Sequence, residues 1–325
     1  MSLPAPGALA DRLGALPVRV QTIEVRRAAV PVPDYAGAAR PSSVVWLSGG
    51  GAIGRGENVA FTDEEQARFA ARPSSLLNSG LRRDGIWAGR VDALVGPTTQ
   101  AYERAALEAA LIDLALRQAG ITLAALAGVS ARSLRVVLSF AARPDAAAYV
   151  RRLRAAGRTE DLKIDVEPTW DAAARAALAG EPGVAVLDFK GRGDTALAEA
   201  LAAQFPRALF EDPPVGTTHP RVARDAPLTT ADAVAEALAR GEAVNLKAPR
   251  MAGPLEVLRA LEHVRAAGAD ALAYLGGMFE VDVGRAQARQ LAALFCAEGP
   301  NDLAPFDAAS DAGRLQVHLD GPGFG

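Results

Sequence analysis

The 325-residue sequence has little of what marks several common classes of protein. Cys296 is its single cysteine, which excludes an internal disulfide and is typical of a reducing cytosol. Because Cys296 lies in an Ala- and Leu-rich helical pattern, we expect a buried structural thiol rather than a nucleophile. No apolar run is long enough to span a bilayer, and the N-terminus has no charged region followed by an apolar one. We therefore expect a cytoplasmic protein.

The charge and the aromatic content of the sequence argue against nucleic acid and membrane surfaces as partners. The formal net charge is -3 and no basic run occurs, which argues against binding to nucleic acid or to a membrane surface. Only 5% of the residues are aromatic, and the tryptophans are too scattered to form a stacking platform. Half of the chain is hydrophobic, which is enough for a sizeable core. We expect a small-molecule ligand, and the sequence leaves open whether the chain forms a homo-oligomer.

A repeat of strands and helices fills the second part of the chain. Short apolar runs rich in β-branched residues alternate with amphipathic segments, which predicts a βα-repeat fold. The predicted strands are 134–140, 162–166, 184–190, 209–211, one near Val222, 243–247, 271–280 and 301–304; the predicted helices are 145–156, 171–178, 195–205, 232–240, 255–267 and 284–295. The sequence thus predicts an α/β barrel, a modified TIM barrel of the (β/α)7β type.

The connection between the fourth and fifth predicted strands is too short for a helix. It carries His219, which we interpret as a loop histidine rather than as a proton shuttle.

The first 130 residues have a different pattern, typical of an α+β domain. Alternating residues near 18–25, 43–47 and 57–61 predict antiparallel strands, and the glycine-rich residues 49–56 predict a hairpin connection. We expect the proline-rich residues 30–41 to form a loop over a pocket. Residues 98–120 predict a helix that ends at Gly120. We place the domain boundary at 130, with the barrel over 131–305 and the tail 306–325 joined to the first domain.

Three carboxylates and an amine close successive predicted strands. Asp188, Glu211 and Asp225 each follow an apolar run, and Lys247 ends the next one. The carboxyl ends of barrel strands converge on one face, where active sites lie. Carboxylate oxygens are the hard ligands that Mg²⁺ prefers, so the pattern predicts a magnesium site beside a lysine.

Several motifs along the chain resemble the enolase superfamily, in particular its muconate-lactonizing and o-succinylbenzoate-synthase branch. The helix that contains Asp113 resembles the last helix of the family's capping domain. The other matching segments are Phe210-Glu211-Asp212-Pro213, Asn245-Leu246-Lys247 with Met251-Ala252-Gly253, Gly276 to Glu280, and the C-terminal Gly321-Pro322-Gly323-Phe324-Gly325. The resemblance covers nearly the whole chain.

This resemblance implies a capping domain on a Mg²⁺-dependent barrel enzyme. Such enzymes abstract the proton α to a substrate carboxylate, and the metal stabilises the enolate that forms. Asp188 and Glu211 match the first two metal ligands. The third is either Asp225 or Asp232; we choose Asp225, because Asp232 is better explained as the start of a helix.

The chain departs from the family pattern at two neighbouring strands. A K-x-K motif becomes Lys163-Ile164-Asp165, and a D-x-N motif becomes Asp188-Phe189-Lys190. Residues two apart on a strand share a face, so all four polar side chains are expected to point into the barrel mouth. Our hypothesis is that Lys190 replaces the missing lysine and pairs with Asp165, and that Lys163, Lys190, Asp165 and Lys247 act in catalysis.

Three functions remain open from the sequence. The first is a Mg²⁺-dependent lyase or isomerase of a carboxylate substrate, which leaves dehydration, cycloisomerisation and epimerisation as alternatives. The second is a degenerate homologue that binds metal or ligand without turnover. The third is a Schiff-base barrel enzyme; the neighbouring acids argue against it, because they keep the amines protonated.

Overall fold

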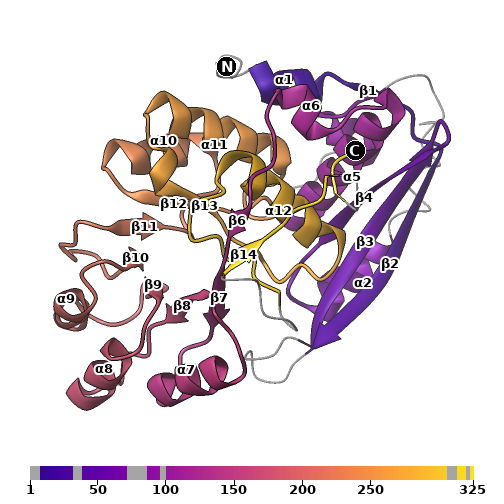
Figure 1. Cartoon of the computed structure of the whole chain (residues 1–325). Helices are drawn as coiled ribbons and strands as arrows, with labels where there is room; N and C mark the ends of the chain where they lie inside the picture. The colour runs from indigo at the N-terminus through magenta and orange to yellow at the C-terminus, as the bar shows by residue number, and fades with distance from the viewer. Residues whose placement is uncertain (1–7, 32–38, 72–85, 96–99, 306–312, 320–322) are drawn as a thin grey trace.

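The computed structural model describes residues 8–31, 39–71, 86–95, 100–305, 313–319 and 323–325. An antiparallel sheet in the order β2-β3-β4 dominates the N-terminal part, with the long helix α5 against it (Figure 1). Its elements are β2 (Thr22–Pro31), β3 (Ala39–Gly49), β4 (Ala52–Asn58) and α5 (Ala101–Ala119). Shorter elements surround them: α1 (Ala8–Gly14), β1 (Pro17–Val18), α2 (Asp63–Ala71), β5 (Ile86–Trp87), α4 (Val91–Val95) and α6 (Leu123–Ala127).

Two glycines let β4 lie directly on α5. A Cβ atom on Gly54 would lie 2.3 Å from the carbonyl oxygen of Ala110, and one on Gly56 would lie 2.0 Å from that of Ala106. Neither distance is accessible to a side chain, so the strand reaches the helix backbone only because both positions are glycine. As the sequence predicts, α5 ends at Gly120, which has a φ of 65°.

The predicted loop over residues 30–41 is shorter than expected. Val30 pairs with Arg40 and Pro31 with Ala39, so β2 and β3 extend into the predicted loop from both sides. Pro41 is tolerated because β4 pairs with β3 only from Ser43 onward, which leaves Pro41 without a strand on that side. Residues 32–38 lie outside the described residues, so no pocket beneath the loop is tested.

A parallel sheet of seven strands forms the barrel, in sequential order from β7 to β13. The strands are β7 (Val137–Phe140), β8 (Asp161–Asp165), β9 (Val184–Asp188), β10 (Leu209–Glu211), β11 (Val222–Arg224), β12 (Ala243–Leu246) and β13 (Ala273–Leu275). Parallel bridges from Val136 to Asn301 and from Gly276 to Asp302 join the last segment to both edges of the sheet. The predicted modified TIM barrel is confirmed.

Helices lie outside the strands of this barrel (Figure 1). They are α7 (Ala146–Ala155), α8 (Ala172–Ala179), α9 (Thr195–Gln204), α10 (Ala231–Ala239), α11 (Pro254–Ala266) and α12 (Val283–Phe295). A 3-10 turn, η2 (Asp270–Leu272), precedes β13, and the short strands β6 (Leu134–Arg135) and β14 (Arg314–Leu315) form an antiparallel pair.

The predicted seventh strand, 271–280, is wrong in extent. The 3-10 turn η2 includes the first two residues of the predicted strand, so β13 starts at Ala273. Phe279, which lies beyond the end of β13, has a φ of 67°. Leu275 lies opposite Leu246, the last residue of β12, and Gly276 pairs with Asp302 instead, so β13 has only three residues.

No helix joins β10 to β11, as the sequence predicts. Instead the imidazole of His219 stacks on the outward ring of Phe210, with 4.0 Å between ring centroids and 10° between planes. The His219 Nδ1 atom accepts a hydrogen bond from the backbone N–H of Arg221 at 3.1 Å. His219 therefore covers a strand that lacks its helix, and this agrees with a structural role.

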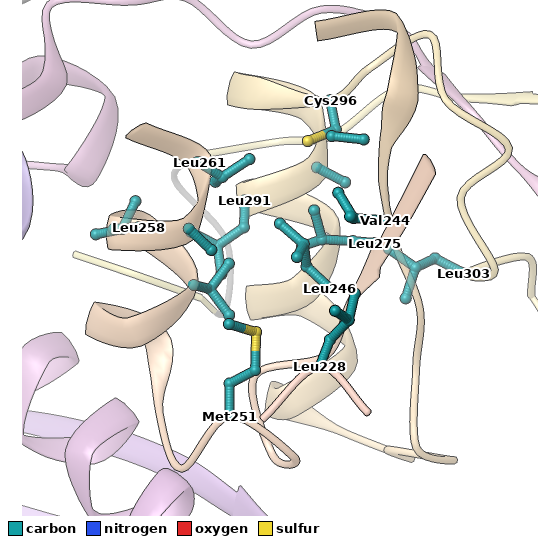
Figure 2. Packing of buried hydrophobic residues seen from close by; sticks show 14 of the residues in the cluster. Leu228, Val244, Leu246, Met251, Leu258, Leu261, Leu275, Leu291, Cys296 and Leu303 are labelled. Carbon is teal, nitrogen blue, oxygen red and sulfur yellow. The ribbon is translucent and has the colours of Figure 1, made fainter. Parts of the chain in front are cut away.

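Apolar side chains of β12 and β13 pack against α11 and α12, as Figure 2 shows. Leu246 and Leu275 face Leu291 and Leu258 within this cluster. Cys296 is buried there, and burial raises the pKa of its thiol to about 12, as expected of a structural cysteine. Among the described residues, no helix combines the length and hydropathy needed to cross a membrane.

Two carboxylates from the N-terminal part reach the first turns of barrel helices. Glu57 accepts hydrogen bonds from the backbone N–H groups of Val281, Asp282 and Gly284, at 2.7, 3.0 and 3.0 Å. Glu108 accepts one from Leu255 at 2.8 Å. Since helix N-termini have unpaired N–H groups, these contacts fix α12 and α11 to the N-terminal part.

Candidate active site

Three acidic residues lie together at the carboxyl ends of neighbouring strands. Asp188 and Glu211 are the last residues of β9 and β10 and stand opposite one another in the parallel register. Asp225 directly follows β11. All three side chains are buried. The structure therefore brings together the three carboxylates that the sequence singles out.

Asp232 lies apart from this group. It is exposed in the first turn of α10, and the residue that caps this helix is Thr230, whose side chain accepts the N–H of Ala233. Of the two alternatives for a third ligand, only Asp225 is buried beside the other acids.

Lys163 on β8 lies among three acidic side chains. Its ammonium is 2.5 Å from Glu211 Oε1, 3.4 Å from Asp188 Oδ2 and 3.6 Å from Asp302 Oδ2. Burial acts to lower the pKa of Lys163, but Glu211 and Asp188 outweigh it and raise the pKa well above its usual value. Lys163 is therefore a permanently charged, enclosed counter-ion of the acids.

Lys190 also pairs with this group, but its backbone does not continue the strand. It lies beyond the end of β9 with a φ of 50°, so the expected alternation along a strand does not apply to it. Its ammonium nevertheless lies 3.1 Å from Asp165 Oδ1 and 2.7 Å from Asp188 Oδ2. The hypothesised ion pair with Asp165 is thus present.

Lys190 is the most accessible of the lysines at these acids. Its side chain is 43% exposed, whereas that of Lys163 is 2% and that of Lys247 is 8%. Burial acts to lower the pKa of Lys190, but Asp188 and Asp165 raise it above its usual value. A charged amine that reaches solvent is well placed to meet an incoming ligand.

Two cations occupy the other end of the acidic group. Lys247 follows β12, and its ammonium lies 2.8 Å from Asp225 Oδ2. The guanidinium of Arg250 donates to Asp225 Oδ1. Glu211 therefore lies between a carboxylate paired with Lys190 and one paired with Lys247.

Sequence reasoning missed the partners of Glu211. The hydroxyl of Tyr274 donates to Glu211 Oε2 at 2.5 Å, and the amide of Asn245 donates to the same oxygen at 3.2 Å. The available signal was the alternation along a strand, since Asn245 lies two residues before Lys247. Burial raises the pKa of Glu211 to about 8 against the opposing charge of Lys163. Asp188 is also buried, but the positive charges of Lys163 and Lys190 outweigh burial there and lower the pKa of its carboxyl group.

The donor chemistry of these acids fits a magnesium ion. Asp188, Glu211 and Asp225 offer carboxylate oxygens from three neighbouring strands, the hard ligands that Mg²⁺ takes. The Oδ1 atom of Asn245, beside Glu211, is buried and has no hydrogen-bond partner among the described residues. Within the same residues, no three acidic, histidine or cysteine side chains are arranged to hold a metal ion. Lysine and arginine groups stand at the carboxylates, so these cations would have to move to admit a metal.

Solved structures share this architecture over nearly the whole chain. A member of the enolase superfamily from Listeria innocua matches with a TM-score of 0.75 and 20% identity, over 94% of each chain. A dipeptide epimerase from Methylococcus capsulatus complexed with Mg ion has a TM-score of 0.73 and 20% identity, over 93% of this chain and 97% of that one. A probable mandelate racemase from Alicyclobacillus acidocaldarius has a TM-score of 0.72 and 21% identity, over 92% of each.

The chain therefore has the fold of the enolase superfamily, and the expected resemblance is confirmed at the level of the fold. More narrowly, the protein belongs to the DUF8230 family, described as a domain of unknown function. The model of its N-terminal domain matches residues 11–126 and that of its C-terminal domain residues 130–308. No curated protein matches the chain.

Proposed function

We propose that this protein is a Mg²⁺-dependent lyase or isomerase that removes the proton α to the carboxylate of a small-molecule substrate. The observation that carries the proposal is the group of buried carboxylates Asp188, Glu211 and Asp225, with Lys190 at one end and Lys247 at the other. The similar epimerase complexed with Mg ion and the similar probable mandelate racemase support this class of reaction.

Asp188, Glu211 and Asp225 would hold the metal. When bound, Mg²⁺ would stabilise the negative charge that develops on the substrate carboxylate as the proton leaves. Lys163 neutralises part of the charge of Glu211 and Asp188 from below the site. Its enclosure excludes water from this side of the acids.

Lys247 and Lys190 would move protons at opposite ends of the group. Asp165 and Asp188 keep Lys190 protonated, which suits a general acid that delivers a proton. We assign proton abstraction to Lys247 and proton delivery to Lys190, with Asp165 holding Lys190 in place. Proton abstraction by one amine and proton delivery by the other would give an epimerisation. In a dehydration, Lys190 would donate the proton to the departing hydroxyl group.

We also propose that residues 1–130 and the tail 306–325 form a capping domain over a catalytic barrel of residues 131–305. The N–H of Gly325 donates to Asp113 of α5 at 3.0 Å, which supports the joining of the tail to the first domain (Figure 1). Such a cap would hold the residues that select the substrate.

A second candidate is a homologue without turnover. The pairing of Asp188 and Asp225 with lysine or arginine favours it, because these cations already neutralise the acids. The Schiff-base alternative is less favoured at Lys163 and Lys190, because their raised pKa values keep both amines from acting as nucleophiles.

Calorimetric titration of Mg²⁺ and exchange of the substrate α-proton together separate the first two candidates. The enzyme proposal predicts saturable binding to the wild-type protein and none to Asp188→Asn, with Asp171→Asn, an exposed cap of α8, as the matched control. It also predicts that the wild type exchanges the α-proton of its carboxylate substrate for deuterium in D₂O, that Lys247→Ala abolishes this exchange, and that Lys190→Ala reduces turnover at least tenfold. Magnesium binding without any exchange across a panel of carboxylates would favour the second candidate, and absent binding would reject the metal site.

A further inference from the structure

Asp212, the residue after Glu211, contacts the ends of both neighbouring strands. Its backbone N–H donates to the carbonyl of Ala223 on β11, and its carbonyl accepts the N–H of Gly191 beyond β9, each at 2.9 Å. Its carboxylate accepts the backbone N–H of Asp225 at 3.1 Å through Oδ1 and that of Ala226 at 2.8 Å through Oδ2. One residue thus links the strand ends that carry all three acids.

The chemistry at this position calls for aspartate. The two consecutive N–H groups each take one carboxylate oxygen, and an asparagine side chain offers a single acceptor in their place. Asp212 also has a φ of 42°, a conformation that Asp and Asn tolerate better than most residues. Because both oxygens are engaged by backbone, Asp212 is not itself suited to bind a metal.

The fold explains why such a link is needed here. β11 has three residues, and its pairing with β10 ends at Ala223 and that with β12 at Arg224, so the ladder does not reach Asp225. No helix connects β10 to β11, and the connection is held by loop contacts such as the stacking of His219 on Phe210. The backbone of Asp225 is therefore fixed by a side chain where a longer strand would use ladder bonds.

We propose that Asp212 is a positioning residue that holds Asp225 in line with Asp188 and Glu211, and so sets the spacing of the three carboxylates. This inference rests on the proposed function for the part that concerns metal binding. The positioning itself is a property of the backbone and is measurable without metal.

The test compares Asp212→Asn with a matched variant, Asp113→Asn. Asp113 of α5 is also buried, and its two oxygens accept the backbone N–H groups of Arg55 and Gly325 and the guanidinium of Arg117. Amide hydrogen exchange of the metal-free proteins measures the opening of residues 222–228, and calorimetry measures Mg²⁺ binding. A general loss of stability affects both variants, whereas loss of positioning affects only one.

We expect Asp212→Asn to speed exchange in residues 222–228 and to weaken Mg²⁺ binding by about 10–100-fold, the usual effect of losing a residue that orients a ligand. Asp113→Asn should leave both readouts unchanged. Wild-type exchange and wild-type affinity in Asp212→Asn would overturn the inference. Faster exchange in Asp212→Asn, combined with a wild type that binds no Mg²⁺, would keep the positioning role and reject the proposed metal site instead.

Discussion

We expect Glu108 to make the stability of the protein depend on pH. The carboxyl group is buried between α5 and the start of α11, and burial raises its pKa to about 7. Below the unfolded pKa of roughly 4.3 both states are protonated, so Glu108 has no effect on the free energy of unfolding there. As pH rises through 7 the unfolded chain has already released this proton, so folding is disfavoured by up to about 3 kcal/mol.

Urea unfolding of the wild type and of Glu108→Gln across this pH range measures the effect. Glutamine keeps an oxygen for the N–H of Leu255, so the variant retains that contact without a titrating group. We expect the wild type to lose stability relative to the variant as the pH rises from about 4 to about 7, between the unfolded and the folded pKa of Glu108. A constant difference between the two proteins at all pH values would contradict this.

The positions of site residues could be predicted from the sequence where the residue lies on a strand, and not where it lies beyond the end of one. Asp188 and Glu211 close short apolar runs and lie where the pattern places them. Lys190 reaches Asp165 from a left-handed turn, which no period of two describes. Tyr274 reads as one more apolar strand residue in the sequence, and only the closed barrel brings its hydroxyl to Glu211.

Among the elements, the contact of β4 with α5 leaves no room for a side chain. The substitution Gly56→Ala would place Cβ within 2.0 Å of the Ala106 carbonyl oxygen, so the strand and helix must separate. We expect a loss of about 1–3 kcal/mol in the free energy of unfolding, the usual cost of overpacking.

Gly180→Ala is the control for this prediction. Gly180 ends α8 with a φ of -73°, and its nearest neighbour would be 3.4 Å from the added Cβ. Equilibrium unfolding should show a lowered midpoint for Gly56→Ala alone. Equal midpoints for both variants would show that β4 can move away from α5 at no cost.

Helices were easier to predict from this sequence than the ends of strands. The predicted helices of the barrel lie within a few residues of the observed ones, because caps such as Asp171 and Asp194 mark where they begin. The strands are held by partners distant in sequence. β2 extends to Pro31 because Ala39 lies opposite it, and β13 stops at Leu275 because its partner β12 ends at Leu246.

For the whole molecule, Glu57 is a polar contact that joins the two parts. It accepts three backbone N–H groups at the start of α12 and the hydroxyl of Ser42. Each carboxylate oxygen accepts two of these four donors, so Glu57→Gln leaves two of them facing an amide NH₂ group and removes the charge. We expect it to lower the free energy of unfolding by about 1–3 kcal/mol.

Urea unfolding of Glu57→Gln beside Glu199→Gln, an exposed glutamate of α9, checks this expectation. The first variant should unfold at a lower urea concentration and the second at that of the wild type. An unchanged midpoint in Glu57→Gln would mean that apolar packing alone joins the two parts.

The contacts of Glu57 and Glu108 also bear on the order in which the chain is made. Glu57 precedes Val281 by 224 residues, and Glu108 precedes Leu255 by 147. At a synthesis rate of about 5–20 residues per second, Glu57 leaves the ribosome on the order of ten to fifty seconds before its partners. During that interval the carboxylates of Glu57 and Glu108 have no backbone N–H partners from α12 and α11, and α5 lacks its contacts with α11. Water hydrates these carboxylates until α11 and α12 emerge, so the hydrogen bonds that join the two parts form only near the end of synthesis.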